Sequence, residues 1–296
     1  MSAAKVQAIV RELAADRIEV KADGRTTVIA SQDGDFRLFG DEPEGFPQLP
    51  AFEPLDFLEV GAPALACLIE RVELAAAREL GRYAVNGALL TWDGETITAV
   101  ATDGRRLALA KHQIKAGRIP PRQAIVPLKG LAMFRKSLAG LGESVGLRLD
   151  ASLVALRTPH ADVTARVLEG EFPDFQEVLA QQHAQKAGVV REELLAAIRR
   201  AAVVLGTDSR AVKLSFHRGT LEVSAREEGS GEAKARIALE YQGPDQDVSV
   251  NPDFMLEFLK LPLTENIQVS FGRAETPVFW RPDEDYLYVV MPIEGP

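Results

Sequence analysis

The sequence contains a single cysteine, Cys67, among its 296 residues. One cysteine cannot form an internal disulfide, so a small disulfide-stapled fold is excluded and a reducing, cytoplasmic location is expected. Long uninterrupted hydrophobic runs are also missing, and the opening stretch MSAAKVQAIVRELAADRIEV is broken up by charges. We therefore expect no membrane-spanning helix, no signal peptide and no membrane partner.

Motifs for catalysis and metal binding are missing as well. The sequence has no phosphate-binding loop ending in Gly-Lys-Ser/Thr and no His-Glu-x-x-His zinc motif. The histidines are scattered without metal-ligand spacing, and each is expected to lie at the surface: His112, His160, His183 and His217. We therefore expect no catalytic centre, no metal and no cofactor.

Positive charge is scarce, because 34 Lys and Arg face 43 Asp and Glu, for a net charge of −9. Taken alone, this argues against a simple basic nucleic-acid-binding protein, although a local basic surface can lie within an acidic total. The helix expected over residues 128–141 carries Lys129 and Lys136 on one face, opposite its apolar stripe, with Arg135 beside them. An ordinary solvated helix face and a functional basic surface both fit this pattern.

An internal repeat is the strongest pattern that is present. Five times along the chain, an amphipathic helix precedes three short strands. The first expected helix begins at residue 6, and the others cover residues 63–80, 128–141, 191–205 and 252–263. The last four are each preceded by a short strand-like piece: DFLEV, AIVPL, AGVV and DVSV. The fold class is therefore α+β, built from strand–helix–three-strand repeats; an independent small domain with coincidental similarity is the alternative for the first repeat.

One such repeat cannot bury both its sheet and its helix, so repeats are expected to pair into domains. Five is an odd number, and the first repeat lacks a leading strand. The Pro-rich stretch FGDEPEGFPQLPAFEP separates it from the rest, and VLAQQHAQKAGVV is expected to be a second linker. The predicted parts are residues 1–52, 53–183 and 184–296.

Several segments together resemble one family. They are RYAVNGALL, VATDGRRLAL, IVPLKG, EFPDFQEVL and the near-terminal YVVMP, and they occur in the family's order over the whole chain. The sequence thus resembles the bacterial sliding clamps, the β subunits of DNA polymerase III. The family has six repeats in three domains, so the resemblance implies that the first half of the N-terminal domain is missing here.

The resemblance implies a function and a set of partners. Clamps of this family are non-catalytic processivity factors that form head-to-tail dimeric rings around double-stranded DNA without reading its sequence. A clamp loader opens the ring, and a groove binds peptides of the polymerase III α subunit and other proteins with clamp-binding motifs. We therefore expect a homodimer that takes part in DNA replication.

By resemblance, the turn after VAT forms one wall of the peptide groove. The expected groove residues are Val85, Thr102, Gly104, Arg105, Arg106, Leu107, Pro173, Val178, Val289, Val290, Met291, Pro292 and Ile293. Aliphatic side chains and a flexible methionine suit an adaptable apolar slot. Replacing Arg106 or Met291 is expected to weaken peptide binding without disturbing the fold. Glu177 stands where the family often has a basic residue, and Glu294 lies in an unusual IEGP tail, so the peptide preference stays open.

The resemblance also implies contacts with DNA and with a second subunit. The expected DNA-binding residues are Arg82, Tyr83, Lys129 and Lys136. The expected dimer contacts join one subunit's Lys5, Ile9, Phe36 and Leu38 to the other subunit's Val203 and Val204. Phe36 and Leu38 alternate along a strand and should share a face.

Two other functions are compatible with the sequence. One is a clamp-like interaction module that keeps the groove but does not close a ring on DNA. The other is an enzyme that uses the arginine turn to hold a phosphorylated substrate, although no base, nucleophile or metal set accompanies that turn.

Overall fold

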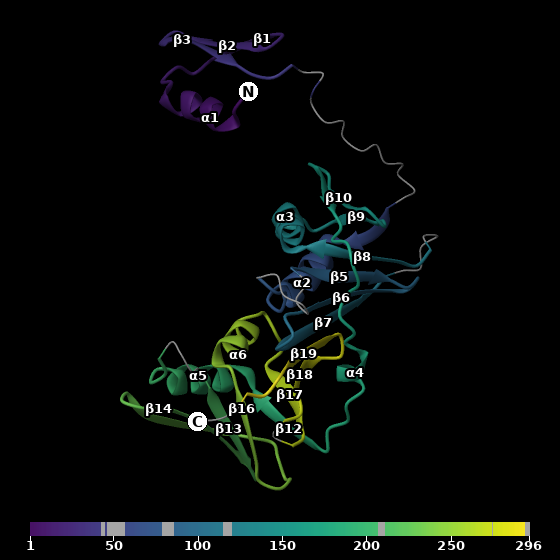
Figure 1. Cartoon of the computed structure of the whole chain (residues 1–296), viewed down its shortest axis with the longest axis vertical. Coiled ribbons are helices and arrows are strands. Elements are labelled where there is room, and N and C mark those ends of the chain that lie inside the picture. Colours follow the sequence, from purple (N-terminus) through teal and green to yellow (C-terminus); the bar gives the residue numbers. More distant parts are fainter. Residues whose placement is uncertain are drawn as a thin grey trace. The chain divides into compact units, whose positions relative to one another are not determined.

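The structure is a computed structural model that describes residues 1–42, 45, 57–78, 86–114, 120–206, 211–273 and 275–293. The chain divides into two compact bodies, which we call the N-terminal body (Met1–Glu53) and the main body (Pro54–Pro296). Figure 1 traces both along the chain. Within the described residues, no helix is long and apolar enough to cross a membrane.

The N-terminal body holds one repeat. Helix α1 (Ala3–Glu12) precedes a three-stranded antiparallel sheet of β1 (Glu19–Asp23), β2 (Thr26–Ser31) and β3 (Gly34–Phe39). Among the described residues of this body, Ile29 and Thr27 on β2 are the buried ones, and α1 buries no residue. Phe36 and Leu38 are half-buried on one face of β3, as their alternation predicts. This body therefore has much less core than the four repeats that follow.

The main body contains those four repeats, each a strand, a helix and three strands. The first is β4 (Leu58–Gly61), α2 (Ala62–Glu73), β5 (Gly87–Trp92), β6 (Thr96–Thr102) and β7 (Arg106–Gln113), and the second is β8 (Arg122–Pro127), α3 (Leu128–Leu138), β9 (Ser144–Leu149), β10 (Leu153–Arg157) and β11 (Asp162–Arg166). After the short helix α4 (Gln176–Leu179), the third is β12 (Gln185–Val190), α5 (Arg191–Ala202), β13 (Val212–His217), β14 (Thr220–Glu227) and β15 (Gly231–Ala238). The fourth is β16 (Gln246–Val250), α6 (Pro252–Leu259), β17 (Asn266–Phe271), β18 (Val278–Asp283) and β19 (Tyr286–Val290).

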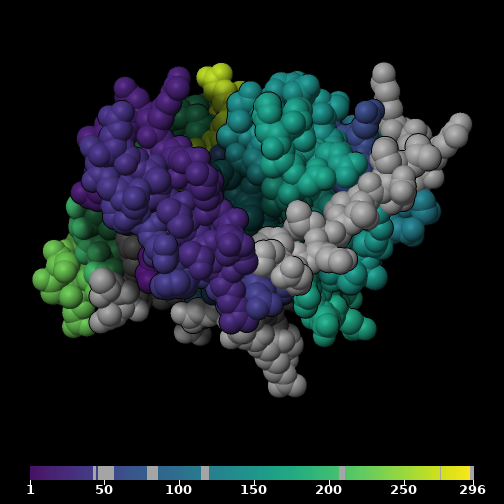
Figure 2. Space-filling view, turned by 90° about the horizontal axis from the view of Figure 1, so that it is seen from above, coloured from purple at the N-terminus to yellow at the C-terminus, as the bar shows by residue number. Residues whose placement is uncertain are grey.

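The repeats pair as expected, and their strands form three sheets. Two sheets have four strands, in the orders β11-β10-β9-β4 and β15-β14-β13-β16. The third has eight, β12-β17-β18-β19-β7-β6-β5-β8, and Figure 1 shows these labels along the length of the main body. Figure 2 shows part of the second repeat, in teal, as one continuous surface. In the eight-stranded sheet, the first and second repeats together supply one half, and the third and fourth repeats supply the other half.

Strands β7 and β19 join the two halves of that sheet. They pair antiparallel over five residue pairs, from Tyr286 opposite Ala110 to Val290 opposite Arg106. Helices α2, α3, α5 and α6 lie on one face of this sheet, and their buried side chains belong to the large core. The other face carries a small second cluster under the segment that contains α4, and Figure 1 shows α2 and α6 on one side of the sheet and α4 on the other. The alternation of the strands thus sends side chains of β7 and β19 into both clusters.

The structure corrects several expected element boundaries. Helices α2, α3 and α6 end at Glu73, Leu138 and Leu259, before the expected ends at residues 80, 141 and 263. The predicted linker VLAQQHAQKAGVV contains the end of α4 and all of β12, so only residues 180–184 lie between these elements. The carboxylate of Asp174 accepts a hydrogen bond from the Gln176 N–H at 2.9 Å, which supports the first turn of α4. Helix α5 ends at Ala202, one residue before Val203, rather than including both valines.

Candidate functional site

The site begins with the turn between β6 and β7. The hydroxyl of Thr102 donates to the carbonyl of Arg106 at 2.8 Å and accepts from the N–H of Gly104 at 3.1 Å. The carboxylate of Asp103 accepts from the N–H groups of Arg105 and Arg106 at 2.9 and 3.0 Å. Gly104 has a φ of 85°, a left-handed conformation that favours glycine. The residue types of this turn therefore fix its shape.

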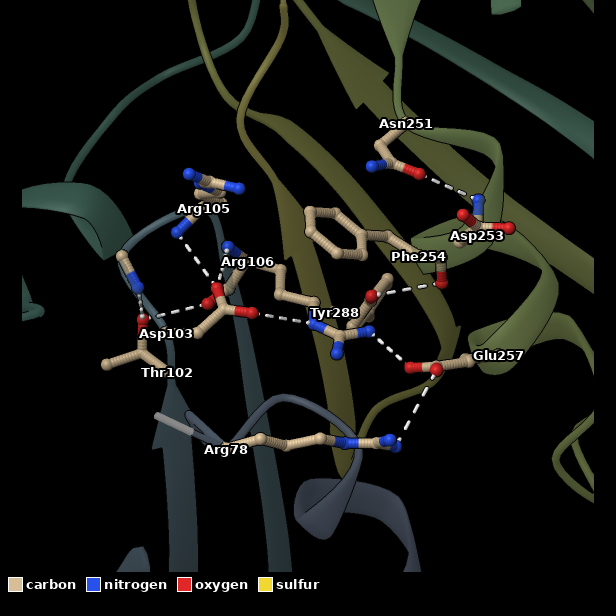
Figure 3. Close-up of polar contacts among 11 residues, drawn as sticks. Arg78, Thr102, Asp103, Arg105, Arg106, Asn251, Asp253, Phe254, Glu257 and Tyr288 are labelled. Carbon is tan, nitrogen blue, oxygen red and sulfur yellow. Dashed lines mark hydrogen bonds and ion pairs between the residues drawn. The ribbon is translucent and has the colours of Figure 1, made fainter. Parts of the chain in front are cut away.

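Arg106 is held inside the protein by the turn and by α6 (Figure 3). Its side chain is only 6% exposed; Nε donates to Asp103 Oδ2 at 3.0 Å and Nη1 to Glu257 Oε2 at 2.6 Å. Its guanidinium lies 4.3 Å from the ring centroid of Phe254. Burial by itself would lower the pKa of Arg106, but Tyr288 and Glu257 outweigh it and raise the pKa above its ordinary value. Arg106 is therefore a fixed cation that ties β7 to α6.

A cavity of about 230 Å³, which we call the groove, opens beside this turn. Leu107 and Val289 form its floor, since they face each other across the β7–β19 pairing. Its remaining lining comes from the turn, from the segment before and within α4, and from the residue after β19: Thr102, Gly104, Arg106, Pro173, Asp174, Phe175, Val178 and Met291. Met291 is 36% exposed, and its N–H donates to the Arg105 carbonyl at 2.8 Å. The groove is thus an apolar slot with an open methionine at its edge.

Eight of the expected groove residues line this cavity, and the others are placed differently. Arg105 is exposed on the turn, and Pro292 and Ile293 lie beyond the lining. Val290 is wholly buried in the large core, on the opposite face of the sheet from Val289. The prediction that both valines line the groove is therefore wrong, because neighbouring residues of a strand point to opposite faces. Val85 and Glu294 lie outside the described residues.

Two lining residues, Asp174 and Phe175, are not among the residues expected from the sequence. Both belong to the segment EFPDFQEVL, of which the resemblance places only the proline and the valine in the groove. Phe175 packs edge-on against Phe172, with ring centroids 6.0 Å apart. Two aromatic residues three apart in a polar segment were the available signal.

The expected DNA-binding residues are only partly described. Arg82 and Tyr83 lie outside the described residues. Lys129 and Lys136 are exposed on α3, as their spacing predicts. Arg135 beside them forms an ion pair with Glu73 of α2 at 3.1 Å, which offsets its charge.

The expected dimer residues belong to different bodies. Lys5, Ile9, Phe36 and Leu38 lie in the N-terminal body, with Lys5 exposed and Ile9 half-buried on α1. Val203 is 81% exposed at the end of α5, and Val204 next to it is half-buried. A single exposed valine is ordinary on a protein surface and does not identify a contact by itself.

Comparisons with known proteins agree with this architecture. The family models for the central and C-terminal domains of the DNA polymerase III beta subunit match residues 59–174 and 176–294. The beta sliding clamp of Chlamydia muridarum is 30% identical over 286 residues, covering 96% of this chain and 78% of the relative. The beta sliding clamp of Vibrio cholerae is 29% identical over 283 residues, covering 95% and 75%.

Solved structures give the same result for the fold. The DNA polymerase III subunit beta from Pseudomonas aeruginosa superimposes with a TM-score of 0.90 at 26% identity, covering 98% of this chain and 81% of that one. The DNA polymerase sliding clamp from Bacillus subtilis gives 0.92 at 25% identity, covering 99% and 79%. These matches confirm the α+β clamp fold that the repeats and motifs predicted, and the chain belongs to the family of DNA polymerase III beta subunits, the beta sliding clamps.

Proposed function

We propose that this protein is the processivity clamp of a replicative DNA polymerase. In this function two copies close into a ring around double-stranded DNA, a clamp loader opens the ring, and the polymerase III α subunit and other partners bind through the groove. The protein has no catalytic activity of its own and works in the cytoplasm. Residues 1–52, 53–183 and 184–296 form the second half of the N-terminal domain, the central domain and the C-terminal domain.

The groove is the observation that carries this proposal. Its floor of Leu107 and Val289 is apolar, its edge is an exposed methionine, and a buried, ion-paired arginine holds the wall. Such a slot suits short apolar side chains of an extended peptide, and methionine adapts to different ones. A small slot of this kind binds isolated peptides with about micromolar affinity, or about −8 kcal/mol.

The proposed DNA contact is electrostatic. Lys129 and Lys136 are exposed on one face of α3, and Arg82 and Tyr83 complete the proposed set. Lysines that contact phosphates give binding that is independent of base sequence and weakens with salt. This is the behaviour that a ring needs if it is to move along any duplex.

The proposed subunit contact joins Lys5, Ile9, Phe36 and Leu38 to the partner's Val203 and Val204. The half-buried face of β3 and the exposed valine at the end of α5 supply apolar area for it. Because the N-terminal body has little core, its contribution to the dimer is expected to be weaker than that of a complete clamp domain.

Retention on circular DNA tests the ring. The protein is loaded onto nicked circular DNA and moved to high salt, where counterions compete away ordinary phosphate contacts. A closed ring stays bound and leaves after the circle is linearised. Equal loss from circular and linear DNA, with a monomer at tens of micromolar in sedimentation, would support the open interaction module instead.

A groove variant tests peptide tethering separately. Met291→Ala removes a partly exposed side chain at the edge of the groove. It should weaken the binding of a polymerase-derived peptide by about 1–2 kcal/mol. Calorimetry measures the affinity, and Met133→Ala, on the exposed face of α3, is the control. Unchanged affinity in Met291→Ala would contradict the groove assignment.

A further inference from the structure

A second and larger cavity lies directly beside the groove. It has a volume of about 510 Å³, and we call it the side pocket. The two cavities share the wall of Pro173, Asp174 and Phe175. An extended peptide advances about 3.3 Å per residue, so residues next to those in the groove would reach the side pocket across this one wall.

The lining of the side pocket combines an apolar base with acidic groups. Leu89, Ile125, Leu168 and Phe172 provide hydrocarbon surface from β5, β8 and the segment before α4. Glu171 and Asp174 are the charged residues of the lining, and both are exposed. Among the described residues, no basic side chain lines the side pocket.

These carboxylates are available to a partner. No ion pair joins Glu171 or Asp174 to another described residue, and Asp174 uses one oxygen to accept the Gln176 N–H. The neighbouring segment EGEFPDFQE adds Glu169 and Glu177, both exposed, and contains no Lys or Arg. The one arginine of the groove, Arg106, is already paired with Asp103 and Glu257. The wall between the two cavities is therefore acidic without internal compensation.

We propose that the side pocket is a second subsite for partner peptides and takes a Lys or Arg side chain that flanks the apolar residues in the groove. A lysine or arginine stem would pack on the apolar base while its charged head stays at the rim with Glu171 and Asp174. Peptides with an acidic flank are repelled at the same place, so the subsite selects among partners by charge. This inference rests on the proposed peptide-binding function of the groove.

Three synthetic peptides test the subsite. All have the same Leu-Leu-Phe centre, and the flanks on both sides are three Lys, three Gln or three Glu residues. Fluorescence anisotropy at 50 mM and 300 mM salt measures their affinities for the full-length protein. We expect the Lys-flanked peptide to bind roughly three- to tenfold more tightly than the Gln-flanked one at low salt, with a smaller ratio at high salt.

Neutral variants locate the effect. The variant Glu171→Gln should remove much of the Lys preference and leave the affinity for the Gln-flanked peptide unchanged, because Glu171 lines the side pocket and not the groove. Glu228→Gln is the matched control, since Glu228 is an exposed acid of the turn between β14 and β15 and lines neither cavity.

The outcomes separate the subsite from the groove. Equal affinity for all three peptides overturns the proposed role of the side pocket and leaves the proposed role of the groove in place. A Lys preference that survives undiminished in Glu171→Gln also overturns it, because the attraction then comes from the net charge of −9 rather than from the side pocket. Binding of none of the peptides overturns the groove and the side pocket together.

Discussion

Replacing Arg106 with alanine should destabilise the main body, contrary to the expectation from sequence that the fold would be undisturbed. The change removes ion pairs to Asp103 and Glu257 and the contact with the ring of Phe254. It also leaves the Asp103 side chain, 18% exposed, without its arginine.

The size of the effect follows from the burial of these groups. Removing one partner of a fully buried ion pair costs about 3–5 kcal/mol. Glu257 is 38% exposed and can regain water, so we expect the lower end of that range, about 3 kcal/mol with the lost ring contact included. For a body of this size, that corresponds to a fall in Tm of roughly 6–12 °C.

Thermal and urea unfolding measure the effect, and the neighbouring arginine is the control. Arg105 is exposed, so Arg105→Ala should change stability by less than about 0.5 kcal/mol. If Arg106→Ala has the same Tm and the same urea midpoint as the wild type and Arg105→Ala, the ion pairs of Arg106 do not stabilise the junction of β7 and α6, and the reasoning is refuted.

Three further outcomes can be measured. Lys129→Glu with Lys136→Glu should weaken binding to duplex DNA for all sequences and reduce the salt slope by about one per lysine; an unchanged slope in a filter-binding titration would contradict the α3 contact. Burial raises the pKa of Glu73 in the folded protein above its usual value. The contribution of this group to the free energy of unfolding therefore falls as pH rises from the unfolded pKa to the higher folded pKa, and Glu73→Gln should gain stability relative to the wild type between pH 4 and 7. Urea unfolding measures this difference, and a relative loss of stability in the variant would contradict the raised pKa. Gly104→Ala should cost about 1–2 kcal/mol, because φ is 85° although nothing crowds the new methyl group, whereas Gly142→Ala, equally uncrowded and without a positive φ, should be close to neutral in thermal unfolding.

Local pattern predicted most of the elements and little of their assembly. The apolar positions of α2, at Leu65, Leu68, Ile69 and Val72, recur with helical spacing, and all are buried. The neighbouring strand β7 alternates less clearly, because the residues from Arg106 to Ala110 are all buried, on both faces of the sheet. Such signals depend on residues close in sequence, which is why the five repeats could be read without a structure.

The groove depends on contacts that no local pattern contains. Arg106 pairs with Glu257, 151 residues away in the sequence, and Leu107 faces Val289 across strands from different repeats. The motifs of the family supplied most of the groove residues, but not the burial of Arg106. They also did not separate Val289 from Val290, although alternation along the strand could have done so.

The pairing of β7 with β19 has a mechanical consequence. The floor of the groove contains one residue from each strand, and the five residue pairs between them join the central and C-terminal halves into one sheet. A partner that pulls on a peptide in the groove therefore loads both halves at once. Under the proposed function, the slack between this protein and a tethered enzyme therefore has to come from the chain that leads to the partner's own peptide, because the floor of the groove belongs to one sheet.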